Sequence, residues 1–383
     1  IGGPADRFFY LSNVNMQDGG RAAYFGTDHS YGHNGISILR YPNEDITWET
    51  SYKSNLAIEM GLFEKTNIQV DLFKEKRKNI LMGRSNIPTS MGLSSGVSAN
   101  VGEASGKGID LSIDHSQAFQ NGSWLQSRIN FTYATSKYDV YEEPQYKEPW
   151  LYRVGYPISV NRGLIAERLF IDDQDVSNSP TQHFGEVRGG DIKYMDVNKD
   201  GQITDLDRVP IGYPTTPEIN YGFGFSYGIK NLDLSVFFQG SARSSFWIDP
   251  SITAPFVERT GSDGLVTQTQ LLKAYADDHW SESNQNIYAL WPRLSETLIN
   301  NNLQTSTWFM RDGSFLRFKQ LEVGYSLPDK LSKKIKMSNF RLYASGTNLM
   351  VWSKFKLWDV EMAGNGLDYP IQRVYNLGIQ LSF

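Results

Sequence analysis

The segment EINYGFGFSYGIK, which runs from Glu218 to Lys230, alternates large apolar residues with small or polar ones at every second position. Successive side chains of a β-strand point to opposite faces, so the pattern predicts a strand with one aromatic face and one glycine-rich face. Glycine is disfavoured on the solvent face of a soluble sandwich, whereas a polar, small-residue face suits the lumen of a membrane barrel. The predicted apolar face is Ile219, Tyr221, Phe223, Phe225 and Tyr227, and the polar face is Asn220, Gly222, Gly224, Ser226 and Gly228.

The same alternation recurs along most of the chain after residue 48. We count about ten or eleven such segments, which are separated by the glycine, asparagine and aspartate residues typical of turns. A strand or pair of strands within 150–170 is the least regular of them. Residues 1–48 lack the period and predict an irregular region, so the predicted β domain covers residues 49–383. Its segments include 56–62, 68–72, 108–116, 123–138, 218–230, 231–240, 314–325, 339–352 and 373–383.

The connections between these segments favour a transmembrane antiparallel β-barrel. Short turns such as Gly228 to Asn231 alternate with long polar excursions, of which 241–312 is the longest, and outer-membrane barrels show this asymmetry. The final strand places Tyr375, Leu377, Ile379, Leu381 and Phe383 on one face. An edge with such a face would aggregate in a soluble protein, whereas an alternating strand with a terminal aromatic residue is similar to the signal used in outer-membrane barrel assembly.

Composition excludes several classes of function. The 383 residues carry a formal net charge of −5 and contain no cysteine, which rules out disulfides and thiolate chemistry. No apolar run approaches the ~20 residues that a transmembrane helix requires. The short basic run KEKRK, Lys74 to Lys78, is interpreted as a solvated strand end or turn, and no nucleic-acid footprint is expected.

The segment DVNKDGQITDLD, Asp196 to Asp207, has the spacing of a calcium-binding loop. Such loops offer side-chain oxygens from positions 1, 3 and 5, a backbone carbonyl from position 7 and an acid at position 12, with glycine at position 6 for the turn. The predicted ligands are Asp196, Asn198, Asp200, Gln202 and Asp207. Neither flank has a helical period, so we expect an EF-like loop without its helix pair; the alternative is a hydrated acidic turn.

Other motifs point less clearly to chemistry. GLSSG, Gly92 to Gly96, fits the nucleophile elbow of hydrolases, but small polar residues surround it and a flexible loop is favoured, so no catalytic residue is expected. The five histidines form no recognised ligand spacing. The tryptophans of the long excursion could stack on sugars, grip a partner protein or pack the loop against itself. They are Trp247, Trp280, Trp291 and Trp308.

Several segments together resemble the SusC/RagA family of TonB-dependent outer-membrane transporters of Bacteroidetes. They include residues 46–63, 100–113, 190–241, 311–328 and 342–361, in the order found in that family. The resemblance implies the C-terminal half of a barrel of about 22 strands, with long extracellular loops. It also implies that the plug domain and TonB box belong to other parts of a longer protein.

Function is likewise implied by this resemblance. The parent protein is expected to import oligosaccharides or oligopeptides with a SusD-like surface lipoprotein, energised by TonB, from within the lipid of the outer membrane. It is not expected to be an enzyme. The alternative is a SusC-like barrel that serves as a structural subunit of a larger outer-membrane complex.

Overall fold

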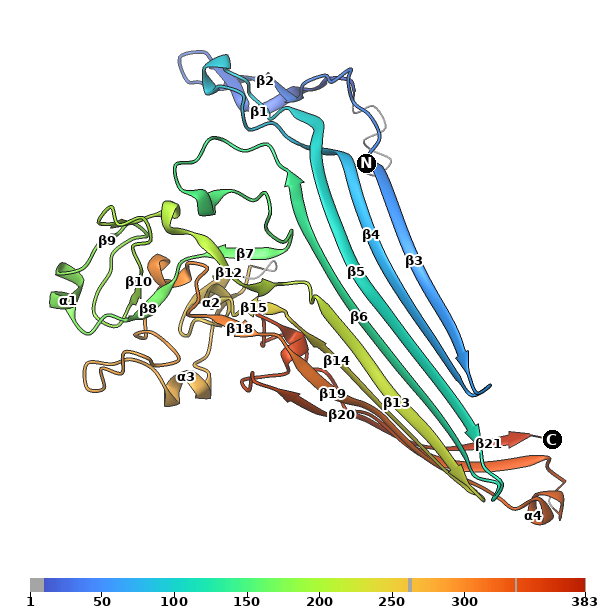
Figure 1. Cartoon of the computed structure of the whole chain (residues 1–383). Helices are drawn as coiled ribbons and strands as arrows, with labels where there is room; N and C mark the ends of the chain where they lie inside the picture. Colours follow the sequence, from blue (N-terminus) through green and yellow to red (C-terminus); the bar gives the residue numbers. More distant parts are fainter. Residues whose placement is uncertain (1–9, 261–263, 335, 383) are drawn as a thin grey trace. The chain divides into compact units, whose positions relative to one another are not determined.

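The computed structural model describes residues 10–260, 264–334 and 336–382. No helix in these ranges is long and apolar enough to cross a membrane. Strands account for 52% of the residues, which confirms the all-β prediction. The dominant element is a nine-stranded sheet in the order β21-β20-β19-β14-β13-β6-β5-β4-β3 (Figure 1). Its strands are β3 (Thr50–Leu62), β4 (Thr66–Gly83), β5 (Ser98–Ala118), β6 (Trp124–Val140), β13 (Ile219–Ile229), β14 (Leu232–Ala242), β19 (Phe315–Ser326), β20 (Asn339–Ser353) and β21 (Val374–Ser382).

The sheet has β3 and β21 as its two edges, and these strands do not pair with each other in the described part of the chain. Nine strands are fewer than the ten or eleven expected, because 150–170 does not join the sheet. That segment forms the short strands β7 (Val160–Gly163) and β8 (Ala166–Leu169), which pair with β12 (Val209–Pro214) and β10 (Ile192–Tyr194). Its irregular alternation reflects these short strands, each of four residues.

The predicted irregular region 1–48 needs a second correction, within its described residues. Strands β1 (Asn13–Phe25) and β2 (Tyr31–Arg40) form an antiparallel hairpin there. The pairing contains register shifts between Asn15 and Asp18 and between Asp18 and Ala23. Each bulge exchanges the faces of the strand, so no single period-two pattern survives in the sequence.

Register confirms the two predicted faces of the central strands. Ser226 lies opposite Ser235, and Phe223 lies opposite Phe238, so the polar and aromatic faces continue from β13 to β14. On the aromatic face, the Phe238 ring stacks on Phe223 at 5.2 Å and on Phe318 at 4.8 Å between centroids. None of the residues predicted to face outward on β13 or β21 belongs to the buried core, and Leu377 of β21 is 89% exposed.

Glycines on the polar face of β13 make room for aromatic rings from neighbouring strands. A Cβ at Gly224 would lie 2.4 Å from the Val236 carbonyl oxygen and 2.9 Å from the Phe237 ring, and one at Gly228 would lie 2.2 Å from the Trp124 indole nitrogen. Such contacts are too close for any side chain. The glycine-rich face is therefore a packing requirement of this sheet as well as a polar surface.

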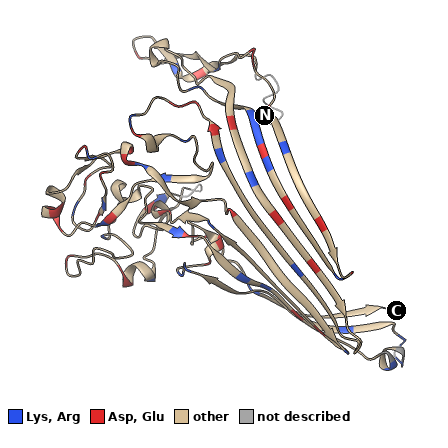
Figure 2. Cartoon of the chain, viewed as in Figure 1, with Lys and Arg blue, Asp and Glu red and all other residues tan. Residues whose placement is uncertain are grey.

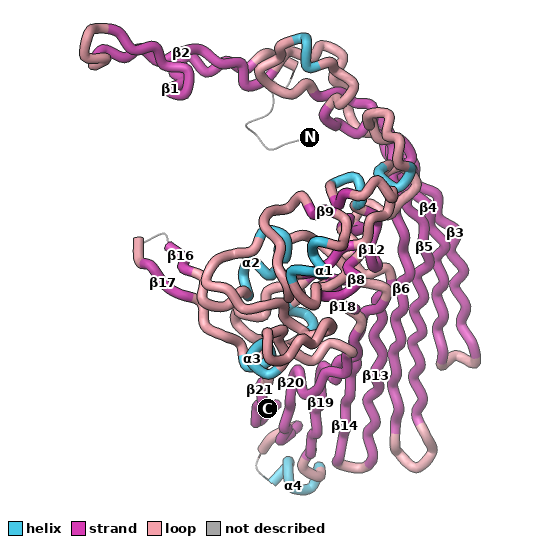
Figure 3. The backbone as a smooth tube through the Cα atoms, turned by 90° about the vertical axis from the view of Figure 1, so that its left-hand side faces the viewer, coloured by secondary structure: helices cyan, strands magenta, loops and turns pink. Residues whose placement is uncertain are grey.

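The contacts divide the chain into two compact units, and β3 to β6 pass through both. One unit comprises 1–55, 73–107 and 135–158, and includes the β1–β2 hairpin. The other comprises 56–72, 108–134 and 159–383. Within this second unit the long connections fold into a cluster of short elements (Figure 3). These elements are α1 (Asp173–Ser177), β9 (Thr181–Gln182), β11 (Gln202–Ile203), η4 (Asp205–Asp207), β15 (Ser245–Trp247), α2 (Pro250–Thr253), α3 (Lys273–Asp277), η5 (Asn300–Leu303), β18 (Met310–Asp312) and η6 (Val360–Met362).

The cluster has a hydrophobic core of its own, which we call the loop core. It draws residues from the connection before β13, the connection after β14 and the connection after β20, so that three excursions are held by one set of contacts. Arg317 of β19 anchors the connection after β20, because its buried guanidinium contacts Asp359 at 2.6 Å and Glu361 at 2.5 Å. The loop core includes Leu164, Leu169, Ile192, Tyr194, Ile203, Phe246, Ile248, Tyr275, Trp280, Trp291, Phe309, Phe355 and Val360.

An ion pair fixes α1 beside β8. Both guanidinium amino groups of Arg168 donate to the carboxylate of Asp175, at 2.5 and 2.9 Å, and the Ile171 N–H donates to the same group. These hydrogen bonds, the Arg168 bond first, hold the pKa of Asp175 well below its usual range. The pair is mostly shielded from solvent, with 22% and 15% of the two side chains exposed.

We predict that Gly224→Ala destabilises the sheet by about 1–3 kcal/mol, because the added methyl group must displace Phe237 or the β14 backbone. The free energy of unfolding in urea, measured on the receptor in detergent or lipid, tests this. Gly83→Ala is the matched control in β4, since a Cβ there meets nothing within 4 Å. Equal stability of the two variants would contradict the packing role of Gly224.

A second prediction concerns acid. Asp175 has a depressed pKa, so its stabilising contribution is complete above the unfolded pKa of about 3.9 and is lost as the pH falls below that value. Asp175→Asn should therefore lower the free energy of local opening near α1 by about 1–2 kcal/mol at pH 7 and flatten its decline below pH 4. Amide hydrogen exchange, corrected for intrinsic rates, measures both effects.

The control for this prediction is Asp205→Asn, which breaks the ion pair with Arg208 at a carboxylate that is 79% exposed. Exposed pairs contribute little, so this variant should change local opening by less than about 0.5 kcal/mol. If Asp175→Asn keeps the full acid dependence, the assignment of that dependence to Asp175 is wrong.

Candidate functional site

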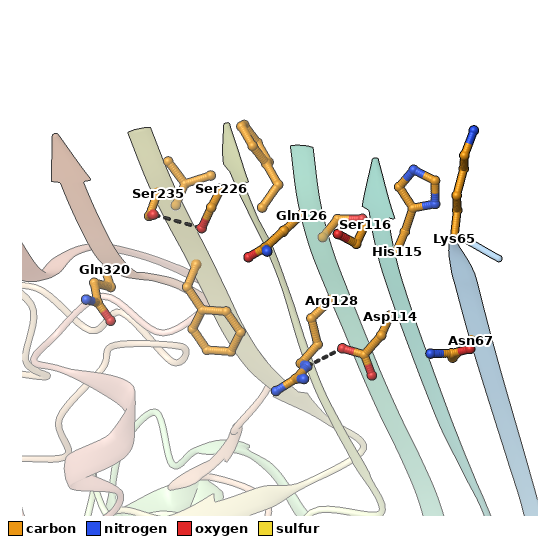
Figure 4. A pocket seen from close by; sticks show the side chains of 15 residues that line it. Lys65, Asn67, Asp114, His115, Ser116, Gln126, Arg128, Ser226, Ser235 and Gln320 are labelled. Atoms are coloured by element: carbon orange, nitrogen blue, oxygen red, sulfur yellow. Dashed lines mark hydrogen bonds and ion pairs between the residues drawn. The ribbon is translucent and has the colours of Figure 1, made fainter. Parts of the chain in front are cut away.

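A hollow of about 620 Å³ opens on the polar face of the large sheet, within the second unit. Figure 4 shows its side chains arriving from neighbouring strands, with Gln126 and Arg128 on β6, Asp114 on β5 and Gln320 on β19. Their positions follow from the alternation predicted for β13, because register places residues of one face opposite one another across the sheet. The polar face predicted from sequence is therefore the wall of an open groove.

The groove is lined by hydrogen-bond donors and acceptors, and it contains both positively and negatively charged side chains. Arg128 donates to Asp114 at 2.5 Å, and both side chains remain substantially exposed, at 66% and 42%. The Ser226 and Ser235 hydroxyls lie 2.8 Å apart, and the Ser112 hydroxyl donates to the Asn130 side chain at 3.1 Å. This chemistry suits solvated polar solutes, and none of these contacts joins a nucleophile to a general base.

A buried polar network joins two of the excursions next to the loop core, where the Gln182 and Asn301 amides donate to the Ile192 carbonyl. The Asn302 amide and the Arg293 Nε both donate to Asp191 at 2.9 Å, and the Gln182 amide donates to Asn301 at 2.7 Å. Burial raises the pKa of Asp191, while Arg293 opposes that shift. Sequence reasoning missed this network, because its partners are 102 to 119 residues apart and have no local spacing signal.

The predicted calcium loop adopts the compact turn that its spacing suggested. Asp196 accepts the backbone N–H groups of Lys199 at 2.7 Å and Gly201 at 2.8 Å, and Asp200 accepts that of Gln202 at 2.8 Å. Gly201 has a φ of +84°, which the tight turn requires. The loop lies between β10 and β12 and contains β11 and the 3-10 helix η4, so no α-helix flanks it in the described structure.

Asp207 closes this loop and is fully buried. Its carboxylate accepts N–H groups from Val197 at 2.9 Å and Thr204 at 2.8 Å, and among the described residues it has no Lys or Arg within ion-pairing distance. Asp207 is also the N3 acid of a capping box on η4, so these backbone N–H groups compensate its burial, as a bound cation would also do. No three His, Asp or Glu side chains of the described chain gather into a metal site, so any ion here would also need the oxygens of Asn198 and Gln202.

The hydrolase-like motif does not form a catalytic arrangement in the described structure. The Ser94 hydroxyl lies 3.4 Å from the Tyr41 hydroxyl, and the Ser94 N–H donates to the Tyr41 hydroxyl at 3.1 Å. The segment leads into strand β5 rather than into the helix that a nucleophile elbow needs. His115 is the histidine beside the groove, and its Nδ1 lies 2.8 Å from the Thr66 hydroxyl.

The tryptophans of the long excursion pack inside the protein. Trp280 and Trp291 are 7% and 6% exposed and belong to the loop core, and Trp247 and Trp308 pack against it. Trp291 also stacks on Tyr275, with 4.2 Å between the ring centroids. Of the three roles left open by the sequence, packing of the loop against itself is the one that the structure shows.

Known proteins place the chain in a family. The sequence profile described as "TonB dependent receptor-like, beta-barrel" matches residues 14–349. The chain is similar to TonB-dependent receptors P3 and P26 of Formosa agariphila, at 25% identity over 377 residues and 27% over 374. Each alignment covers 91% of this chain, and the chain spans 36% of the length of each relative.

Solved structures agree at the level of fold. The RagAB peptide importer in its "open-open" state matches 98% of this chain with a TM-score of 0.66 at 22% identity, and the match covers 38% of that chain. The "closed-closed" state gives 0.65 at 23% identity, again over 98% of this chain and 39% of the other. This family is a class of transporters and receptors and not a class of enzymes. The chain therefore belongs to the TonB-dependent receptor β-barrel family and is an integral protein of the outer membrane.

Proposed function

We propose that this chain forms part of a SusC-like importer that takes up oligopeptides or oligosaccharides, receives them from a SusD-like surface lipoprotein, and is energised by TonB. The family match and the fold shared with the RagAB peptide importer support uptake across the outer membrane. Because the chain spans 36% of its curated relatives, the plug and the TonB-binding segment would belong to the remainder of the receptor.

The groove on the polar face is the observation that carries this proposal. A path for hydrophilic solutes through a membrane needs polar groups that do not bind so tightly that the solute cannot leave. Such groups are provided across four neighbouring strands by Arg128, Asp114, Gln126 and the paired serines of β13 and β14. They can contact peptide amides or sugar hydroxyls equally well, so both substrate classes remain within the proposal.

A pair of variants in the full-length receptor tests the path. Ser226→Trp with Ser235→Trp should reduce TonB-dependent uptake of labelled oligopeptides or oligosaccharides by about tenfold, because bulky rings narrow a pore whose diameter controls passage. Leu234→Trp is the matched control, since it lies next to Ser235 on the opposite, apolar face of β14. The amount of receptor in the outer membrane is measured alongside uptake.

Unchanged uptake in the double variant would contradict a transport path along this face. Uptake that persists after deletion of TonB would contradict the energy source. If the receptor takes up neither substrate class and remains bound in a larger assembly, the structural-subunit alternative replaces import.

We also propose that the loop 196–207 binds calcium through Asp196, Asn198, Asp200, the Gln202 carbonyl and Asp207. Oxygen donors at this spacing match the preference of calcium for six to eight hard ligands. The burial of Asp207 without a cationic partner is the structural support for this proposal. A bound ion would stiffen the connection between β10 and β12 and hold Ile203 in the loop core.

Asp207→Asn should weaken calcium binding by at least about tenfold, because it removes the acid at position 12 of the loop. Isothermal titration of the calcium-stripped receptor measures the affinity, and amide exchange over 196–207 reports ordering independently of transport. Asp205→Asn is the control, since that carboxylate is exposed and outside the ligand spacing. The same affinity in both variants would refute the site.

A further inference from the structure

The basic run KEKRK lies inside a strand and not at its end. Strand β4 continues from Thr66 to Gly83, and its alternate residues Ile68, Val70 and Leu72 are followed on the same face by lysines. A strand places residues of equal parity on one face, so the apolar stripe of β4 passes directly into a basic stripe. The basic stripe consists of Lys74, Lys76 and Lys78.

Register brings a fourth lysine opposite this stripe. The Ser116 N–H donates to the Lys65 carbonyl at 2.8 Å, and Lys76 and Lys78 reach Glu103 at 2.9 and 3.9 Å. These contacts fit a single antiparallel register of β4 against β5, and in that register Lys107 is the cross-strand partner of Lys74. Like charges placed directly opposite each other destabilise a sheet unless a counter-charge lies between them.

The third strand extends the same surface. Ion pairing of Arg128 with Asp114 and hydrogen bonding of Ser112 to Asn130 fix β5 against β6. In that register Lys137 lies opposite Ser105. Thr135 lies opposite Lys107, and therefore in line with Lys74 across the three strands. We call Lys74, Lys76, Lys78, Lys107 and Lys137 the lysine patch. Figure 2 shows basic bands along β4, β5 and β6, interspersed with acidic ones.

The lysine patch has an excess of positive charge. Its five lysines face two carboxylates, Glu103 and Asp139, which leaves a net charge of +3. Lys74 and Lys107 are exposed and form no ion pair with a described carboxylate, and the Lys137 side chain is 55% exposed. All seven residues belong to the first compact unit.

We propose that the lysine patch binds the phosphate groups of phosphorylated lipids in the outer leaflet. Lysine is a compact cation that binds phosphate as a point charge, and a phosphate between Lys74 and Lys107 would relieve their mutual repulsion. Clusters of basic residues beside an apolar membrane segment attract anionic lipid head groups in this way. The proposal depends on the outer-membrane location and is independent of what the receptor transports.

The position of the patch favours a lipid over a soluble anion. Lys107 and Lys137 have the parity of the apolar residues Ile109 and Phe131, whereas the groove residues Asp114 and Arg128 have the other parity. The lysine patch therefore lies on the apolar face of its strands and not on the groove face. Lys74 and Lys107 lie near the middle of β4 and β5, whereas Lys76, Lys78 and Lys137 lie in the halves of β4 and β6 that lead into the longer connections, which are on the external side of such barrels.

Binding of fluorescent diphosphoryl lipid A to the full-length receptor in detergent tests this inference. Lys74→Gln with Lys107→Gln should weaken binding about 30-fold, because each lysine near an anionic lipid contributes roughly 1 kcal/mol. Lys273→Gln with Lys354→Gln is the matched control, since these lysines are 86% and 85% exposed and lie in the connections between strands. The control should bind as the unmodified receptor does.

Three further measurements separate the possible sources of binding. Dephosphorylated lipid A should bind weakly to every variant, and inorganic phosphate at matched concentration should not displace the lipid. Thr135→Lys adds a cation in line with Lys74 and Lys107 and should strengthen binding. Unlike weaker binding in the glutamine variant, a gain in binding cannot arise from misfolding. Unchanged affinity in a folded Lys74→Gln, Lys107→Gln receptor, equal binding of dephosphorylated lipid, displacement by free phosphate, or no gain from Thr135→Lys would each overturn the proposal.

Discussion

Backbone N–H and C=O groups that cross a lipid layer must find their hydrogen-bond partners within the protein, because hydrocarbon offers none. In this chain the pairing of β13 with β6 and β14, and of β19 with β14 and β20, meets that demand along strands of 11 to 17 residues. Once the pairing is set, register dictates the face of every side chain. The aromatic surface, the polar groove and the lysine patch are three consequences of this one constraint.

Glycine has a specific place in this arrangement. The polar face of β13 could not carry larger residues at Gly224 and Gly228, because Phe237 and Trp124 occupy the space above them. Aromatic rings thereby cover the backbone at the points where a side chain is missing. The result is a face that is tightly packed near the backbone and still open enough above it to form a groove of about 620 Å³.

The long connections obey a different rule. Outside lipid their backbone can be hydrated, so they gain a fixed structure only by building a core of their own. The apolar area of this core includes Tyr275, Trp291 and Phe309. Asp191 accepts hydrogen bonds from Arg293 and Asn302, so these buried polar groups are paired. Arg317 then links this cluster to β19 through Asp359 and Glu361. A rigid set of connections of this kind gives a receptor a defined external surface instead of independent flexible loops.

The sequence by itself determined the strand content, the two faces of β13 and β21 and the family, because period-two alternation is a local property of the chain. It also located the compact turn at 196–207, whose glycine and acidic positions are set by short-range spacing, while its metal remains a prediction. Tertiary structure alone decided that 150–170 leaves the sheet, that the tryptophans pack in or against the loop core, and that Asp191 meets Arg293 and Asn302. These outcomes depend on which distant segments pair and pack, and a pairing between residues about a hundred positions apart has no periodic signature in the sequence. The opposition of Lys74 and Lys107 that we infer belongs to the same group, since it depends on the register between β4 and β5.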